Sequence, residues 1–261
     1  MNKSAYLAGP FIGELDWELY RFAPYAIHLK RENPNAKLIV YTRPTRFDLY
    51  GSYADILVPL NLKYEKQYEQ HCFGLFGFDN KDYDLLKDFY YKKYAKRYEI
   101  EDHIVPDVCI WRKKIKWQFS RSEMDYNFRP RKQNEKILDG LFDSTNSVFV
   151  SSGDSDIRRS LSNMGYDPIM QHWLIDVVKN NGTNLETSFV GCLIVLIKKC
   201  RFVVSNVNSL SAKIALLLGV PVISINEKMK YDSVRLLNPF NVPVINCYEI
   251  EEGVDIYEDN F

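Results

Sequence analysis

The sequence predicts an α/β protein made of two halves, each built around a parallel β-sheet. The clearest observation is the stretch 201–225, where two buried strands flank a short apolar helix. The second is that strand, turn and helix also follow one another at 147–159 and at 4–31. Unbroken apolar strands that alternate with helices are typical of parallel sheets. The third is length, because 261 residues suffice for two domains of about 130 residues each.

The first half alternates apolar strands with amphipathic segments. Leu15, Leu19 and Phe22 recur at helical spacing, which predicts a helix after the first strand. The expected order is strand 4–9, helix 14–31, strand 37–42, strand 53–59, a helix around 89–97 and strand 104–111. The basic segment 112–132 is then predicted to be a linker or mobile loop, which divides the chain into domains 1–132 and 133–261.

The second half is richer in apolar residues. Its expected order is strand 147–152, a turn into a helix at 153–159, a short segment at 168–179, an apolar helix at 185–199 and the strand–helix–strand unit at 201–225. The acidic stretch 249–259 is expected at the surface or as a fraying end. Two α/β halves of this kind predict domains that face each other across a cleft.

A turn rich in hydroxyl and amide side chains precedes the helix of 201–225. It carries Ser205, Asn206, Asn208, Ser209 and Ser211. A helix N-terminus offers free backbone N–H groups and a partial positive charge, so the turn predicts a site for an anionic, nucleotide-like ligand. The alternative is that Ser205 or Ser209 only caps the helix.

Three carboxylates crowd the turn between the first strand and the first helix. This turn contains Gly9, Gly13, Glu14, Asp16, Trp17 and Glu18. Acids stabilise a helix N-terminus, which accounts for one or two of them. Ligands meet open α/β sheets at the carboxyl ends of strands, so Glu14 and Asp16 are candidates for a general base. Gly13, Trp17 and Glu18 are expected to contact or orient an acceptor.

Basic and aromatic residues interleave in the segment 112–132. It holds eight basic side chains against two acidic ones. This composition suits a nucleic acid, a lipid phosphate or a polyanionic glycan, with Arg129 and Arg131 as expected contacts. The alternative is a solvated loop with a few rings tucked into the core.

Composition limits the other classes of protein. The 34 basic and 34 acidic side chains cancel, so bulk charge favours neither nucleic-acid nor membrane binding. Five cysteines without a CxxC pair predict reduced thiols and a cytoplasmic location. No apolar run is long enough to span a bilayer, and we expect no transmembrane segment and no signal peptide. The four histidines are scattered, and none is assigned to metal or catalysis.

The second half resembles glycosyltransferases of the GT-B fold. The likeness rests on the apolar helix 185–199, the strand and polar turn 199–209, and the helix and strand 215–225. That order is similar to the donor-binding domain of heptosyltransferases and related enzymes, a viral or phage type included. The resemblance implies two compact Rossmann-like domains and a nucleotide-sugar donor. The chain is short for such a transferase, and after Pro221 only Glu227 is placed to bind a donor ribose.

The resemblance also implies roles for individual residues. The donor diphosphate would contact Ser152, Gly153, Ser205, Asn206, Asn208 and Ser209. Arg158 would balance the leaving diphosphate, since guanidinium pairs with phosphate through two hydrogen bonds. A surface arginine is the alternative reading of Arg158. The acidic turn is similar to the acceptor-side turn that carries the base in these families.

Asp154 and Asp156 follow an apolar strand with the spacing by which another class of transferases holds a divalent metal on a nucleotide sugar. The alternative is that Asp156 caps a helix beginning at Ile157. We therefore expect no obligatory metal.

Together these features predict a metal-independent glycosyltransferase. The half 1–132 would bind a glycan, lipid or DNA acceptor, and the half 133–261 would bind the nucleotide sugar. The alternative is a non-catalytic nucleotide- or glycan-binding protein that kept the fold and lost the chemistry. The carboxylates at 14, 16 and 18 favour the enzyme, because a binding protein needs no base.

Overall fold

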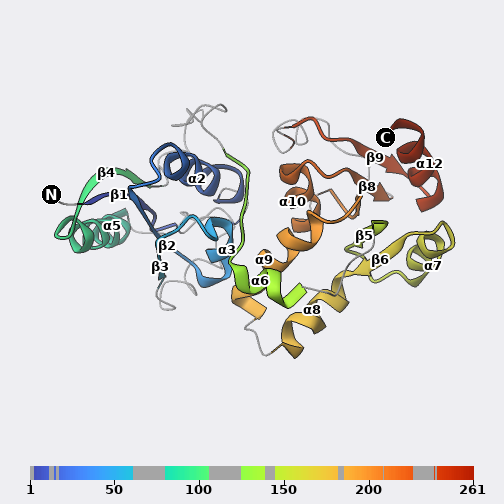
Figure 1. Ribbon diagram of the computed structural model, residues 1–261, viewed down its shortest axis with the longest axis horizontal. Helices are drawn as coiled ribbons and strands as arrows, with labels where there is room; N and C mark the ends of the chain where they lie inside the picture. The colour runs from blue at the N-terminus through green and yellow to red at the C-terminus, as the bar shows by residue number, and fades with distance from the viewer. Residues whose placement is uncertain are drawn as a thin grey trace. The chain divides into compact units, whose positions relative to one another are not determined.

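The computed structural model forms two compact units, Met1–Arg129 and Pro130–Phe261, each with its own parallel β-sheet (Figure 1). The residues described are 3–11, 15, 18–60, 80–105, 125–138, 145–181, 185–207, 209–225, 238 and 240–261. Both halves are therefore α/β in class, as the sequence predicts. No helix in these ranges is long and apolar enough to cross a membrane.

The first unit holds a four-stranded sheet in the order β3-β2-β1-β4. Its strands are β1 (Lys3–Ala8), β2 (Lys37–Thr42), β3 (Ile56–Pro59) and β4 (Tyr98–Ile104). Its helical elements are the π-helix η1 (Glu18–Phe22), α2 (Ala23–Glu32), the 3-10 turn η2 (Pro44–Arg46), α3 (Phe47–Tyr50) and α5 (Asn80–Ala95). All strand pairs are parallel.

Helices cover both faces of this sheet. Leu86, Tyr90 and Tyr94 of α5 pack against Leu7 and Tyr41 of the two central strands. Successive residues of a strand point to opposite faces, and α2 packs against β1 and β2. The chain runs from β1 to β3 in one direction and then crosses back to β4, so right-handed connections place α2 and α5 on opposite faces. Burial on both faces explains why β1 and β2 read as apolar runs.

The first unit differs from the expectations in three details. The segment expected as a helix over 14–31 is helical at residue 15 and from Glu18 to Glu32, but Glu18–Phe22 form the π-helix η1, because Pro24 has no N–H to continue the α-helical ladder. The third strand begins at Ile56 rather than at 53. The strand expected at 104–111 lies outside the described residues from 106 onward, whereas β4, which ends at Ile104, was not expected. As an edge strand β4 is only half buried, so its sequence carries charges and was not recognised.

The second unit holds a five-stranded parallel sheet in the order β6-β5-β7-β8-β9. Its strands are β5 (Ser147–Val150), β6 (Asp167–Met170), β7 (Val203–Val204), β8 (Val222–Ile225) and β9 (Val244–Cys247). Its helices are α6 (Lys132–Leu138), α7 (Ser155–Asn163), α8 (Gln171–Asn180), α9 (Leu185–Ile197), α10 (Leu210–Leu218) and α12 (Ile250–Asn260). The predicted strand–helix–strand unit is β7-α10-β8.

The segment expected as a linker is only partly described. Residues 106–124 lie outside the described ranges, and 125–131 follow an irregular path. The helix α6 begins at Lys132, within the expected loop, and packs against α9.

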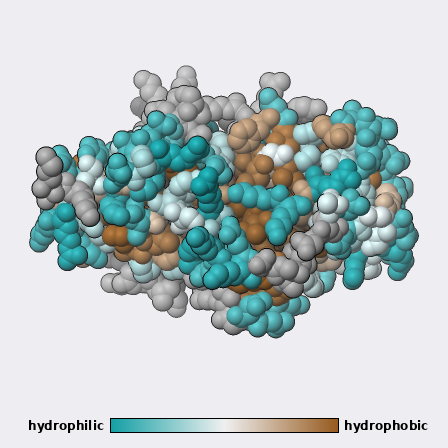
Figure 2. All heavy atoms as spheres, in the orientation of Figure 1, coloured by the Kyte–Doolittle hydropathy of each residue, from teal (hydrophilic) through white to brown (hydrophobic). Residues whose placement is uncertain are grey.

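The acidic C-terminal stretch is part of the core, which corrects the expectation of a fraying surface end. It forms α12, whose Ile250, Val254 and Tyr257 are buried against β8, β9 and α7. Figure 2 shows mostly hydrophilic residues on the surface over this helix. The acidic side chains are thus on the exposed side of α12. The helical spacing of its apolar residues, and not its net charge, determines that the segment packs on the sheet.

Each sheet has a point where the order of its strands reverses. In the first unit the chain moves from β1 to β2 on one side and returns to β4 on the other. In the second it moves from β5 to β6 and returns to β7. The loops at the carboxyl ends of the two strands beside such a point form the usual ligand site of an open α/β sheet. These loops carry the acidic turn in the first unit and the serine-rich turns in the second.

Candidate functional site

Four serines meet at the carboxyl ends of β5 and β7. The Ser205 hydroxyl lies 2.5 Å from that of Ser151, 2.5 Å from that of Ser209 and 3.0 Å from that of Ser211. Ser205 is buried, whereas Ser151 and Ser209 are half-buried. We call these four residues the serine cluster. It joins the polar ends of the two strands at the reversal point of the second sheet.

Ser209 caps α10. Its hydroxyl accepts a hydrogen bond from the backbone N–H of Ala212 at 3.1 Å, which confirms the capping role expected as one alternative. Asn206 is exposed next to it, and Asn208 lies outside the described residues. The loop between β7 and α10 therefore combines hydroxyl groups with the positive end of a helix dipole. This combination favours the binding of an anion.

The turn after β5 supplies a second helix start at the same edge. The Ser152 hydroxyl accepts from the N–H of Asp154 at 3.5 Å, and Gly153 is exposed, with no atom within 4 Å of where a Cβ would lie. Asp154 caps α7 by accepting from the N–H of Asp156 at 2.8 Å. The cap is thus Asp154, and the helix begins at Ser155. The expected cap at Asp156 and start at Ile157 were wrong.

The Asp-x-Asp pair has ordinary roles in the structure. Asp154 uses a carboxylate oxygen as a helix cap, and Asp156 forms an exposed ion pair with Arg159 at 3.5 Å. Over the described ranges, no three His, Cys, Asp or Glu side chains are grouped to hold a metal ion.

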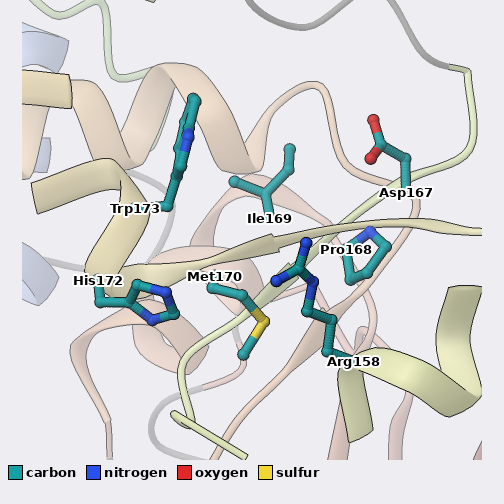
Figure 3. Close-up of a pocket in the computed structure, with 7 residues that line it drawn as sticks. All are labelled: Arg158, Asp167, Pro168, Ile169, Met170, His172 and Trp173. Carbon is teal, nitrogen blue, oxygen red and sulfur yellow. The ribbon is translucent and has the colours of Figure 1, made fainter. Parts of the chain in front are cut away.

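A pocket of about 280 Å³ lies along β6 and the start of α8. Arg158 lines it together with His172 and Trp173, and Figure 3 shows Arg158 and His172 beside Met170, with Trp173 and Ile169 on the other side of the strand. A guanidinium, an imidazole and an indole that line one pocket suit an anionic or aromatic group. No sequence pattern points to His172 and Trp173, because their position depends on where β6 ends.

Arg158 and the serine cluster lie on opposite sides of β5. The pocket borders β6 and the cluster involves β7, and both strands pair with β5. Strands two places apart are separated by about 10 Å. A ligand over the end of β5, at Ser152 and Gly153, would lie between the two.

The N-terminal turn is anchored at the reversal point of the first sheet. Gly9 has φ +101°, and a Cβ on it would lie 2.1 Å from the Tyr41 carbonyl oxygen, so only glycine fits. Its N–H donates to the Ile104 carbonyl at 2.8 Å. His103 Nε2 lies 2.7 Å from the Gly9 carbonyl, an acceptor, so this nitrogen carries the proton. Burial lowers the pKa of His103 and outweighs the opposing effect of this hydrogen bond.

The expected base lies beyond this anchor. Gly13, Glu14, Asp16 and Trp17 are outside the described residues. Phe11, just before them, donates its N–H to the Tyr41 carbonyl at 3.0 Å.

Glu18, the first described residue after Trp17, is fully buried. Its carboxylate accepts hydrogen bonds from Thr42 (2.6 Å), Arg46 (2.9 Å) and Tyr50 (2.8 Å). Burial, and then the charge of Glu18, raise the pKa of Tyr50 well above its usual value, so the phenol stays protonated and donates. The structure thus gives Glu18 an internal role at the end of the turn rather than an exposed acceptor contact.

The two arginines expected at an acceptor have different surroundings. Arg129 is exposed, with its guanidinium 5.6 Å from the centre of the Tyr53 ring. Arg131 is half-buried, and its carbonyl accepts from the N–H of Asn134. The other basic residues of 112–124 lie outside the described ranges.

Solved structures of known glycosyltransferases share this fold. A glycosyl transferase family 9 protein from Veillonella parvula DSM 2008 matches with a TM-score of 0.53 and 11% identity, over 100% of this chain and 92% of that one. E. coli heptosyltransferase WaaC with ADP matches with a TM-score of 0.51 and 10% identity, over 99% and 100%. WaaC with ADP-2-deoxy-2-fluoro heptose gives the same TM-score. No family model and no curated protein sequence matches the chain.

The chain therefore has the GT-B fold, with two parallel-sheet α/β domains. The fold resemblance drawn from residues 185–225 is confirmed. Identities near a tenth define the fold alone, so the reaction has to be argued from the site.

Proposed function

We propose that the chain is a glycosyltransferase that moves a sugar from a nucleotide-sugar donor to a hydroxyl acceptor. The observation that carries this proposal is the pair of serine-rich helix starts beside the reversal point of the second sheet, in a GT-B fold. Two neighbouring helix N-termini suit a diphosphate, which presents two anionic groups. The ADP and ADP-sugar bound to WaaC support a donor of this class.

The second unit would bind the donor. The diphosphate would lie over Ser152 and Gly153, with the serine cluster on one side and the β6 pocket on the other. Asn206 and Asn208 would complete the rim on the side of α10. Arg158 would offset the charge that develops on the leaving diphosphate, so no metal would be obligatory.

The first unit would present the acceptor. Glu14 or Asp16 would take the proton of the acceptor hydroxyl while its oxygen attacks the anomeric carbon. As the new bond forms, the bond from that carbon to the diphosphate oxygen breaks. Gly13 and Trp17 would contact the acceptor. Glu18 would position the end of the turn through its hydrogen bonds to Thr42, Arg46 and Tyr50. Arg129 and Arg131 would bind an anionic acceptor, such as a glycan, a lipid phosphate or DNA.

Ligand binding tests the donor site. Nucleoside diphosphates should raise the melting temperature of the full chain, because a ligand that binds only the folded state stabilises it. Ser205→Ala and Gly153→Val should weaken this shift in melting temperature. They change the loops after β7 and β5, where the diphosphate would lie. Ser162→Ala, an exposed serine on α7, is the matched control. If no common nucleoside diphosphate shifts the melting temperature, the donor site is wrong.

Turnover separates the enzyme from a non-catalytic binding protein. Glu14→Gln and Asp16→Asn should leave the nucleotide-induced shift unchanged, and loss of the base should lower turnover by about 10²- to 10⁴-fold in one of them. Full turnover in both variants would remove the proposed base. A thermal shift without turnover on any acceptor would favour the non-catalytic alternative.

The acceptor class has its own test. If DNA is the acceptor, its binding should weaken steeply with salt, and Arg129→Glu with Arg131→Glu should weaken it further. Binding that does not change with salt would exclude DNA and leave a glycan or lipid acceptor.

A further inference from the structure

The outward side of α5 carries apolar side chains that the fold does not use. Leu85 is 68% exposed and Phe89 is 65% exposed. They lie one helical turn apart and so stand side by side. With Tyr91 they are all the large hydrophobic side chains that stand exposed in the described part of the first unit. Exposed apolar residues that gather on one helix point to an interaction surface.

The opposite side of α5 is fully packed. Leu86, Tyr90 and Tyr94 are buried against the sheet, and the Tyr90 hydroxyl donates to the Ile39 carbonyl at 2.8 Å. The helix is thus held without Leu85 or Phe89. Stability of the first unit does not account for these two residues.

Two lysines continue the same stripe. Leu85, Phe89 and Lys92 follow at intervals of four and three residues, which is the period of one helix face, and Lys96 lies in the turn directly after α5. Both lysines are exposed, and among the described residues neither forms an ion pair. Asp84, an acid of the same helix, pairs with Lys87 at 2.9 Å. Asp88, an exposed acid one turn before Lys92, offsets part of the charge of the two lysines. The stripe therefore combines apolar groups with a small net positive charge.

We propose that this face of α5 docks on the surface of an anionic lipid bilayer. Leucine and phenylalanine enter the boundary between head groups and acyl chains, and the lysine ammonium groups reach back to lipid phosphates. Anionic lipids complement the charge of Lys92 and Lys96. The face is one convex side of a helix, which fits a flat surface better than a bound peptide. Leu85 offers no ring for stacking, which disfavours a nucleic acid.

Vesicle co-sedimentation of the full chain tests this surface. Vesicles of phosphatidylglycerol and phosphatidylcholine should bind the protein, and pure phosphatidylcholine vesicles should bind it at least about tenfold more weakly. Leu85→Ser with Phe89→Ser, and separately Lys92→Glu with Lys96→Glu, should each reduce binding by about tenfold or more. Lys136→Glu with Lys179→Glu, exposed lysines of the second unit, is the control and should bind as the unmodified chain does.

Three results would overturn the proposal. The first is equal binding of the unmodified chain to anionic and neutral vesicles, and the second is unchanged binding of both double variants. The third is loss of binding in the lysine variant alone, which would indicate a surface for polyanions in general. Thermal unfolding of each variant shows whether the fold is intact. Because vesicle binding needs no donor, the outcome is independent of the proposed transferase activity.

Discussion

At the scale of single residues, Glu18 is held inside the first unit by three hydrogen bonds. Its buried carboxylate accepts them from Thr42, Arg46 and Tyr50, and Glu18 follows directly on the residues proposed to carry the base. The guanidinium of Arg46 also lies 5.8 Å from the centre of the ring of Phe11, which precedes that turn. One arginine thus touches both ends of the turn. The buried ion pair thus links Glu18 with Phe11, the described residues on either side of the turn.

Glu18→Ala should destabilise the protein by about 3–5 kcal/mol, because it leaves the Arg46 guanidinium buried without its counter-charge. Glu18→Gln keeps an acceptor for Thr42 and Tyr50, so its loss should be smaller. Denaturant unfolding of the two variants measures the difference. A cost below about 1 kcal/mol for Glu18→Ala would show that water or another group takes over the pairing.

His103 should make the stability of the fold depend on pH. Its pKa in the folded state lies below the ordinary value of about 6.5, chiefly because the ring is buried. The unfolded chain therefore binds a proton that the folded chain resists, and stability should fall as the pH drops from about 7 towards 5. His103→Gln keeps an N–H for the Gly9 carbonyl and does not titrate. Its unfolding free energy should fall less over this range, and an identical fall would exclude His103 as the cause.

At the scale of secondary structure, α12 packs closely against β8 and β9. The Cβ that an alanine would add at Gly253 would lie 2.7 Å from both the Cys247 sulfur and Ile223 Cγ2. A real Cβ does not approach so closely, so an alanine at this position requires the two side chains or the helix to shift.

Gly253→Ala should therefore destabilise the protein by about 1 kcal/mol net. Overpacking costs about 1–3 kcal/mol, which exceeds the gain of up to about 1 kcal/mol from the better helix propensity of alanine. Asp255→Ala on the exposed side of the same helix is the control, with an expected change within about 0.5 kcal/mol. Thermal or urea unfolding compares the two. A stabilised Gly253→Ala variant would show that α12 can shift outward without loss.

The elements that could be predicted from the sequence are those buried on both faces. β1, β2, β5, α9 and the β7-α10-β8 unit read as apolar runs because sheet and helices enclose them. Edge strands such as β4 face solvent in part, so their periodicity is weak. Three members of the serine cluster, Ser205, Ser209 and Ser211, were predicted because a hydroxyl-rich turn follows a buried strand. Ser151 was not, since its contact with Ser205 depends on the pairing of β5 with β7. The pocket at His172 and Trp173 was not, since it depends on the three-dimensional junction of β6 and α8.

At the scale of the whole molecule, the two units repeat one arrangement. Each has a parallel sheet whose strand order reverses once, and each carries its polar loops at that reversal. This arrangement gives each unit one sheet edge of the kind at which open α/β sheets bind ligands. The proposed donor site in the second unit rests on described residues at the ends of both β5 and β7.

Hydrogen–deuterium exchange of the full chain with and without a nucleoside diphosphate tests this claim most directly. Bound diphosphate should slow exchange of the backbone N–H groups in 151–156 and 205–212, which start α7 and α10. Exchange at the opposite edge of the second sheet, where β5 begins at residues 146–148, should change little. Protection confined to the first unit, or none in 151–156 and 205–212 at saturating nucleotide, would contradict the account.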